Sequence, residues 1–175
     1  MISTFIIAAT SKDGFIAKDA DHNSFKWTSE EDHKRFVELT KRAGVVIVGS
    51  KTFKTFKNPL KDRVNIVYSR SQKFNASNVT STSDNPGVLL NKLDALGFKE
   101  AAVIGGAEIY RMFLDKDVVD RIYLTIEPVE FGSGIRFHTG YLDSRFDIVS
   151  EKPVNDKGTI FREYVRKTAP ALKKS

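Results

Sequence analysis

The chain has 175 residues, 41% of them hydrophobic, which is enough for one compact domain with a substantial core and too few for two. It contains no cysteine, which excludes disulfides, thiolate catalysis and cysteine-ligated metals and leaves the cytoplasm as the expected location. The net charge is +6, but basic and acidic residues are interleaved throughout, so we expect attraction for small anions and no nucleic-acid-binding stripe.

The first apolar run, Ile2–Ala9, has the composition of a β-strand. It lacks a basic flank and is far too short to span a membrane, so we expect no membrane partner. A polar loop follows through Lys26. Ser29 then precedes three acidic residues and a periodic apolar segment, which predicts a helix from Glu30 to about Arg42 with Ser29 as its N-cap.

The rest of the chain alternates strands with helices and ends in two alternating segments. We predict strands at Val45–Val48, Arg63–Ser69, Ala101–Ile104, Arg121–Pro128, Phe146–Val154 and Thr159–Arg166, and helices starting at Lys51, running from Pro86 to Leu96 and covering Ala107–Leu114. The polar segment Gln72–Asn85 is predicted to be mostly loop. Glycines at Gly97 and Gly158 mark a helix end and a hairpin turn.

This order favours a single α/β domain over residues 1–167. We expect a mixed, mostly parallel twisted sheet with helices on both faces and a C-terminal antiparallel hairpin. Residues 168–175 are expected to form a disordered tail. A monomer is favoured over a dimer.

Two segments have a strand that runs directly into glycine and then a helix: AGVVIVGSKTF around Gly49 and EAAVIGGAEIY around Gly105 and Gly106. A glycine at this point lets the backbone N–H groups of the next helix approach an anion, although it also serves tight packing alone. Neither segment matches a P-loop or the Rossmann glycine pattern. The pair suggests a dinucleotide bound across the strand ends.

Asp32 lies in the first turn of the predicted helix, four residues before Phe36 and seven before Leu39. This spacing places its carboxylate on the apolar face of the helix. A buried carboxylate needs a cationic or hydrogen-bonding partner, and a heterocycle with an amidine-like edge is one such partner. By contrast, His22, His33 and His138 lack the spacing of metal ligands, so we predict surface or loop positions for them and no metal site.

These segments together resemble the dihydrofolate reductase family, including the related reductase domain of riboflavin-biosynthesis proteins. The resemblance covers most of residues 1–166. It depends on the order and spacing of short motifs: the Ile2–Ala9 strand, Trp27 before Asp32, Phe36, Gly49 with Thr52, Pro59-Leu60 before Arg63 and the Asn65–Ser69 strand, Ile104-Gly105-Gly106 with Tyr110, and Tyr123-Leu124-Thr125.

The resemblance implies that Asp32, joined to the Thr125 hydroxyl, hydrogen-bonds a pterin and favours its protonation at N5 while hydride passes from NADPH to C6. It implies that Arg63 grips the glutamate tail of folate through two parallel hydrogen bonds. The other residues that it places against the substrate are Ile7, Ala8, Trp27, Phe36, Leu60 and Ile104.

For the cofactor, the resemblance places the glycine pair and the following helix start under the pyrophosphate and nicotinamide. Lys51 and Arg70 are expected to hold a 2′-phosphate and so to select NADPH over NADH. The implied cofactor-binding residues are Ala9, Ile16, Gly49, Ser50, Lys51, Thr52, Ser69, Arg70, Gly105, Gly106, Ala107, Glu108, Ile109 and Tyr110.

The chain departs from the family pattern in the polar loop Asp19–Lys26, which lacks an apolar residue over the nicotinamide, and at several glycine positions, including Ala107 and Asp62. Three functions therefore remain open. The first is reduction of 7,8-dihydrofolate with NADPH. The second is a riboflavin-pathway or pteridine reductase, which the SKDGFIA motif also suits. The third is a nucleotide-binding protein without catalysis on the same scaffold.

Overall fold

A computed structural model describes residues 1–137 and 142–168 of the chain. The predicted tail over residues 168–175 and His138 lie outside the described residues, apart from residue 168. No helix in these two ranges is long and apolar enough to cross a membrane. The helices are α1 (Glu30–Ala43), α2 (Ser50–Lys54), α3 (Pro86–Ala95), α4 (Ala107–Asp115) and α5 (Leu142–Arg145), with a 3-10 turn at Ser24–Lys26.

The larger sheet has nine strands in the described part of the chain, in the order β10-β11-β8-β1-β7-β3-β4-β6-β5. Its strands are β1 (Ser3–Ser11), β3 (Val45–Gly49), β4 (Val64–Tyr68), β5 (Asn75–Ala76), β6 (Val79–Thr82), β7 (Glu100–Gly105), β8 (Arg121–Glu127), β10 (Phe146–Pro153) and β11 (Ile160–Arg166). The strands from β8 to β6 pair in parallel, whereas β10, β11 and β5 pair antiparallel. The predicted sheet and its C-terminal hairpin are therefore confirmed.

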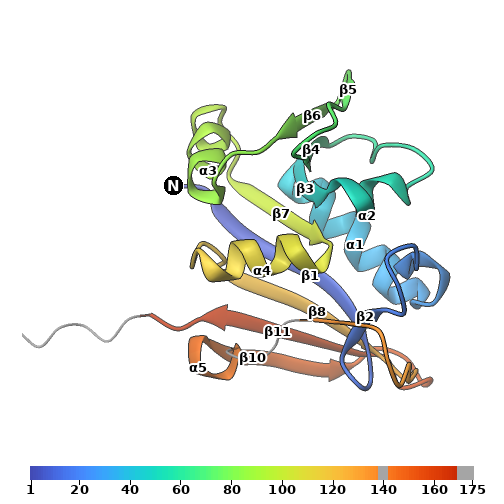
Figure 1. The fold of residues 1–175 in the computed structure, drawn as a ribbon. Coiled ribbons are helices and arrows are strands. Elements are labelled where there is room, and N and C mark those ends of the chain that lie inside the picture. The colour runs from blue at the N-terminus through green and yellow to red at the C-terminus, as the bar shows by residue number, and fades with distance from the viewer. Residues whose placement is uncertain (138–141, 169–175) are drawn as a thin grey trace, which may run out of the picture.

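The sheet is covered on both faces, as predicted (Figure 1). Side chains alternate along each strand, so neighbouring residues of β1 enter different cores. Ile6 packs with α3 and α4, whereas Phe5 and Ile7 pack with α1, with Phe53 of α2 and with Phe56 just after it. The central strand β3 is completely buried over Val45–Val48, which explains its uniformly apolar sequence.

Short strands that depend on distant partners were missed. The segment Gln72–Asn85 is mostly loop, as predicted, but it also contains two short strands that were not predicted: β6 pairs in parallel with β4, and β5 pairs with β6. Its Ser and Thr residues hide this pairing, since of its residues 79–82 only Val79 is buried. A separate two-stranded sheet joins β2 (Phe15–Ala17) to β9 (Ile135–Arg136), which lie far apart in the sequence.

Candidate active site

A cleft of about 1270 Å³ lies at the carboxyl ends of the parallel strands. The ends of β1, β3, β4, β6 and β7 contribute to it, together with α1, α2, α4 and the loop before α1. Ligands of open α/β sheets bind at this position because strand ends and helix starts meet there. The fold thus brings segments between residues 7 and 116, together with Ile135 of β9, around one cavity.

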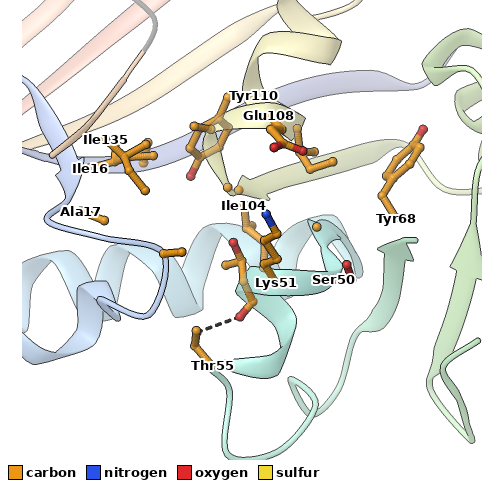
Figure 2. A pocket seen from close by; sticks show the side chains of 18 of the residues that line it. Ile16, Ala17, Ser50, Lys51, Thr55, Tyr68, Ile104, Glu108, Tyr110 and Ile135 are labelled. Carbon is orange, nitrogen blue, oxygen red and sulfur yellow. Dashed lines mark hydrogen bonds between the residues drawn. The ribbon is translucent and has the colours of Figure 1, made fainter. Parts of the chain in front are cut away.

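Most of the residues expected at the site from the sequence line this cleft. Figure 2 shows Ile16 and Ile135 at one end, Tyr68 at the other, and Lys51 and Ile104 between them. The expected residues that line it are Ile7, Ala8, Ala9, Ile16, Asp32, Phe36, Gly49, Ser50, Lys51, Thr52, Ser69, Arg70, Ile104, Gly105, Gly106, Ala107, Glu108, Ile109 and Tyr110.

Asp32 is the buried carboxyl group of the cleft, with 7% of its surface exposed. The helix start places it there, because the Ser29 hydroxyl accepts a hydrogen bond from the Asp32 N–H at 3.3 Å and caps α1. Burial raises the pKa of Asp32; the hydroxyls of Thr125 and Thr28 partly offset this effect, and the charge of Glu127 adds to it. The group therefore holds a proton at higher pH than an exposed carboxyl does.

The glycine pair at the end of β7 brings α4 close to α2. A Cβ atom on Gly106 would lie 2.8 Å from the Thr52 Oγ1, so only glycine leaves this contact intact. Just beyond, the Tyr110 hydroxyl donates a hydrogen bond to the Ile7 carbonyl at 2.9 Å and ties α4 to β1. Burial raises the pKa of Tyr110, and the charge of Asp32 contributes, so this hydroxyl stays protonated.

Four residues expected at the substrate lie outside the cleft lining. Thr125 is buried on β8 opposite Ala9, with its hydroxyl beside the Asp32 carboxyl group. Trp27 stacks on His22, with ring centroids 6.1 Å apart, and meets Phe131 edge-on. The other two, Leu60 and Arg63, belong to the segment before β4.

Arg63 is 8% exposed, and its guanidinium is engaged within the protein. Its Nη1 donates to the Thr40 hydroxyl at 2.7 Å and its Nε donates to the Lys61 carbonyl at 2.8 Å. The fully buried Asn65 holds the same segment, because its side chain bonds both the N–H and the carbonyl of Leu60. This segment is therefore a fixed element beside the cleft.

The structure also places residues in the cleft that the sequence analysis did not select. Phe25 lines it and packs edge-on against Phe36 at 5.4 Å, so the loop before α1 does supply an apolar side chain. Its position two residues before Trp27 was the available signal. His33 packs against Phe25 and its Nε2 is buried, so the predicted surface or loop position is wrong for His33. His33 lies three residues before Phe36 on α1, so both side chains reach Phe25 from the same side of the helix.

Tyr68 at the far end of the cleft was also missed. It is 9% exposed, and its hydroxyl is a buried polar atom without a hydrogen-bond partner among the described residues. Within residues 1–137 and 142–168 there is no group of three His, Asp or Glu side chains arranged to hold a metal ion. The chemistry of the cleft is thus that of one buried carboxyl group, aromatic walls, glycine-lined backbone and four lysine and arginine side chains, Lys51, Arg70, Arg111 and Lys116.

Known proteins match this chain over nearly its whole length. The sequence model for dihydrofolate reductase matches residues 2–166. The type 3 dihydrofolate reductase of Salmonella typhimurium is 30% identical over 162 residues, which cover 91% of this chain and 94% of that protein.

Two solved structures share the fold. A Shewanella sp. PV-4 protein named for riboflavin biosynthesis has a TM-score of 0.79 and 22% identity, over 95% of this chain and 100% of its own. The dihydrofolate reductase of Enterococcus faecalis, complexed with NADP(H), has a TM-score of 0.75 and 21% identity, over 95% of this chain and 97% of its own. The chain belongs to the dihydrofolate reductase family.

Proposed function

We propose that this protein reduces 7,8-dihydrofolate to tetrahydrofolate with NADPH. The observation that carries the proposal is Asp32, a carboxyl group with a raised pKa on the wall of a cleft large enough for two ligands. Such a group can hydrogen-bond the amidine-like edge of a pterin and favour protonation at N5. The hydroxyls of Thr28 and Thr125 lie beside Asp32 outside the cleft lining, so they would orient its carboxyl group toward that edge.

The residues at the start of α4 fit a dinucleotide. The N–H groups of Ile109 and Tyr110 donate to the Gly106 carbonyl, whereas those of Ala107 and Glu108 have no acceptor within the helix. Gly106 is the N-cap of α4 and makes no side-chain hydrogen bond. Because it has no Cβ, the Thr52 hydroxyl can lie close to the start of the helix. These groups would hold a pyrophosphate, and Lys51 and Arg70 would hold a 2′-phosphate. NADPH, when bound, would supply the hydride.

The decisive experiment follows NADPH absorbance with dihydrofolate across pH for the native protein and for Asp32→Asn. The asparagine has nearly the same shape but cannot carry the proton, so we expect a loss of about 10²–10⁴-fold at neutral pH. Asp94→Asn, a change at a partly exposed carboxylate of α3 outside the cleft lining, is the matched control and is expected to keep native turnover. NADPH binding, measured by quenching of Trp27 fluorescence, shows whether each variant retains its cofactor site.

Full activity of Asp32→Asn would refute the role of this carboxyl group. Tight NADPH binding without turnover of any pterin by the native protein would instead indicate a nucleotide-binding protein on a reductase scaffold.

One observation favours a second candidate, a reductase of a ribityl-phosphate pyrimidine. Arg63 lies outside the cleft lining and its guanidinium is bonded to Thr40 and Lys61, whereas a folate tail requires it at the cleft. A smaller hollow of about 500 Å³ adjoins the cleft and is lined by Lys26, Lys51 and Lys54, which suit a phosphate. The similarity to the Shewanella protein agrees with this candidate. Preferred turnover of a pyrimidine phosphate over dihydrofolate would establish it.

A further inference from the structure

A second buried carboxylate lies behind Asp32. Glu127, at the end of β8, is 3% exposed. Its Oε1 accepts hydrogen bonds from both the backbone N–H and the hydroxyl of Ser29, each at 2.7 Å. Its Oε2 accepts from the Thr159 hydroxyl, also at 2.7 Å. Three short bonds to one carboxylate are the arrangement that stabilises a buried negative charge.

The directions of these bonds follow from the neighbouring donors. The Asp32 N–H donates to the Ser29 Oγ, so the Ser29 proton is directed at Glu127. The Asn155 amide donates to the Thr159 Oγ1 at 3.0 Å, so the Thr159 proton is directed at Glu127 as well. Glu127 therefore accepts through both oxygens, and a relay of two hydrogen bonds connects it to the backbone of Asp32.

We propose that Glu127 is a positioning residue for Asp32. It joins the first turn of α1 to the end of β8 and, through Thr159, to the β10–β11 turn, and thereby fixes where Asp32 meets the cleft. Glu127 does not itself line the cleft, so it acts through Asp32 and Ser29. The inference rests on the proposed function in taking Asp32 as the working carboxyl group.

Electrostatics agrees with this geometry. Burial raises the pKa of Asp32 and the charge of Glu127 raises it further, while the hydroxyls of Thr125 and Thr28 and the neighbouring His33 lower it. The remaining groups that face Asp32 are Arg35, on its own helix, and Tyr110, on α4. Removing the charge of Glu127 leaves these groups in place, so the pKa of Asp32 should fall.

The test is Glu127→Gln, which keeps the shape and the acceptor for Ser29 but removes the charge. The titration of the Asp32 carboxyl is followed by ¹³C NMR in the free protein, with Asp32→Asn to assign the signal. We expect its midpoint to fall by about 0.5–1 pH unit, which lowers the protonated fraction about 3–10-fold above the midpoint. The pH profile of kcat should move by the same amount. Thr159→Val, which removes one hydrogen bond but no charge, should leave the midpoint in place.

An unchanged Asp32 midpoint and an unchanged pH profile in folded Glu127→Gln would overturn the inference. If that variant does not fold, Glu127→Asp takes its place, because the shorter side chain keeps the charge but cannot reach Ser29 and Thr159 together. Positioning then predicts a loss of kcat of about tenfold with a native midpoint, whereas native kcat overturns it. Since the NMR titration needs no substrate, it decides the role of Glu127 even if the native protein fails to reduce dihydrofolate.

Discussion

The segment that precedes β4 should depend on the amide of Asn65. This side chain is fully buried; its Oδ1 accepts from the Leu60 N–H at 3.1 Å, and its Nδ2 donates to the carbonyls of Leu60, Arg63 and Asn78. In Asn65→Ala all four hydrogen bonds disappear, but not all four partner groups are left without a hydrogen bond. The Asn78 amide still donates to the Leu60 and Arg63 carbonyls, and the Asn78 carbonyl still accepts from the Asn65 N–H.

The loss is therefore one unsatisfied donor, the Leu60 N–H, together with several weakened bonds and a small cavity. An unsatisfied buried donor costs about 1–3 kcal/mol, and each net hydrogen bond about 0.5–1.5 kcal/mol. We expect the free energy of unfolding to fall by about 3 kcal/mol, which lowers Tm by about 6–12 °C in a chain of this size.

Urea and thermal unfolding followed by far-UV circular dichroism measure this loss. Asn78→Ala is the matched control. The Leu60 and Arg63 carbonyls lose the Asn78 amide as a donor but keep that of Asn65, so the free energy of unfolding should fall by only about 1 kcal/mol. If Asn65→Ala is no more destabilising than Asn78→Ala, the assignment of the Leu60 N–H as the stranded group is wrong.

Two further outcomes concern the glycine cradle and the loop contacts of Asp13. Gly106→Ala places a Cβ 2.8 Å from the Thr52 Oγ1, so the free energy of unfolding should fall by about 1–3 kcal/mol and NADPH binding should weaken. Because Thr52→Ala removes the clashing atom, adding it should restore most of the Tm. No recovery in the double variant would exclude this clash as the cause. The Ser11 hydroxyl and the N–H groups of Gly132 and Phe131 lower the pKa of Asp13 to about 2, so its stabilising contribution is complete above pH 3.8 and is lost as the pH falls through about 2. The emission of Trp27, the single tryptophan, which packs on Phe131, should change over that range, and Asp13→Asn should abolish the transition; a transition that persists in Asp13→Asn belongs to another group.

The main elements of the fold were predictable because their signals are local. Ser29 before acidic residues fixes the start of α1, and the apolar run at Val45–Val48 requires a strand covered on both faces. By contrast, β2 and β9 each hold only a few residues and exist through pairing with one another, so neither carries a pattern of its own. The strand β6 was missed for the same reason, because it pairs with β4 through backbone hydrogen bonds and its side chains show no strand pattern.

The site was predictable to the extent that it follows strand ends and glycines. Asp32 was found because its spacing from Phe36 and Leu39 puts a charge on an apolar face, and the structure buries it. Glu127 escaped notice because an acidic residue at the end of a strand is ordinarily exposed. Its burial depends on the turn at Thr159, which no local pattern brings to the start of α1.

The place of β1 in the sheet has a consequence for how the chain folds. This first strand lies between β7 and β8, with Ser3 paired to Glu100 and Phe5 paired to Arg121. During synthesis, about three fifths of the chain must therefore be made before the first of these neighbours, β7, is complete. Such distant pairings make folding slow and leave the early segments open to aggregation, so the emerging chain should benefit from chaperones that shield its N-terminal strand.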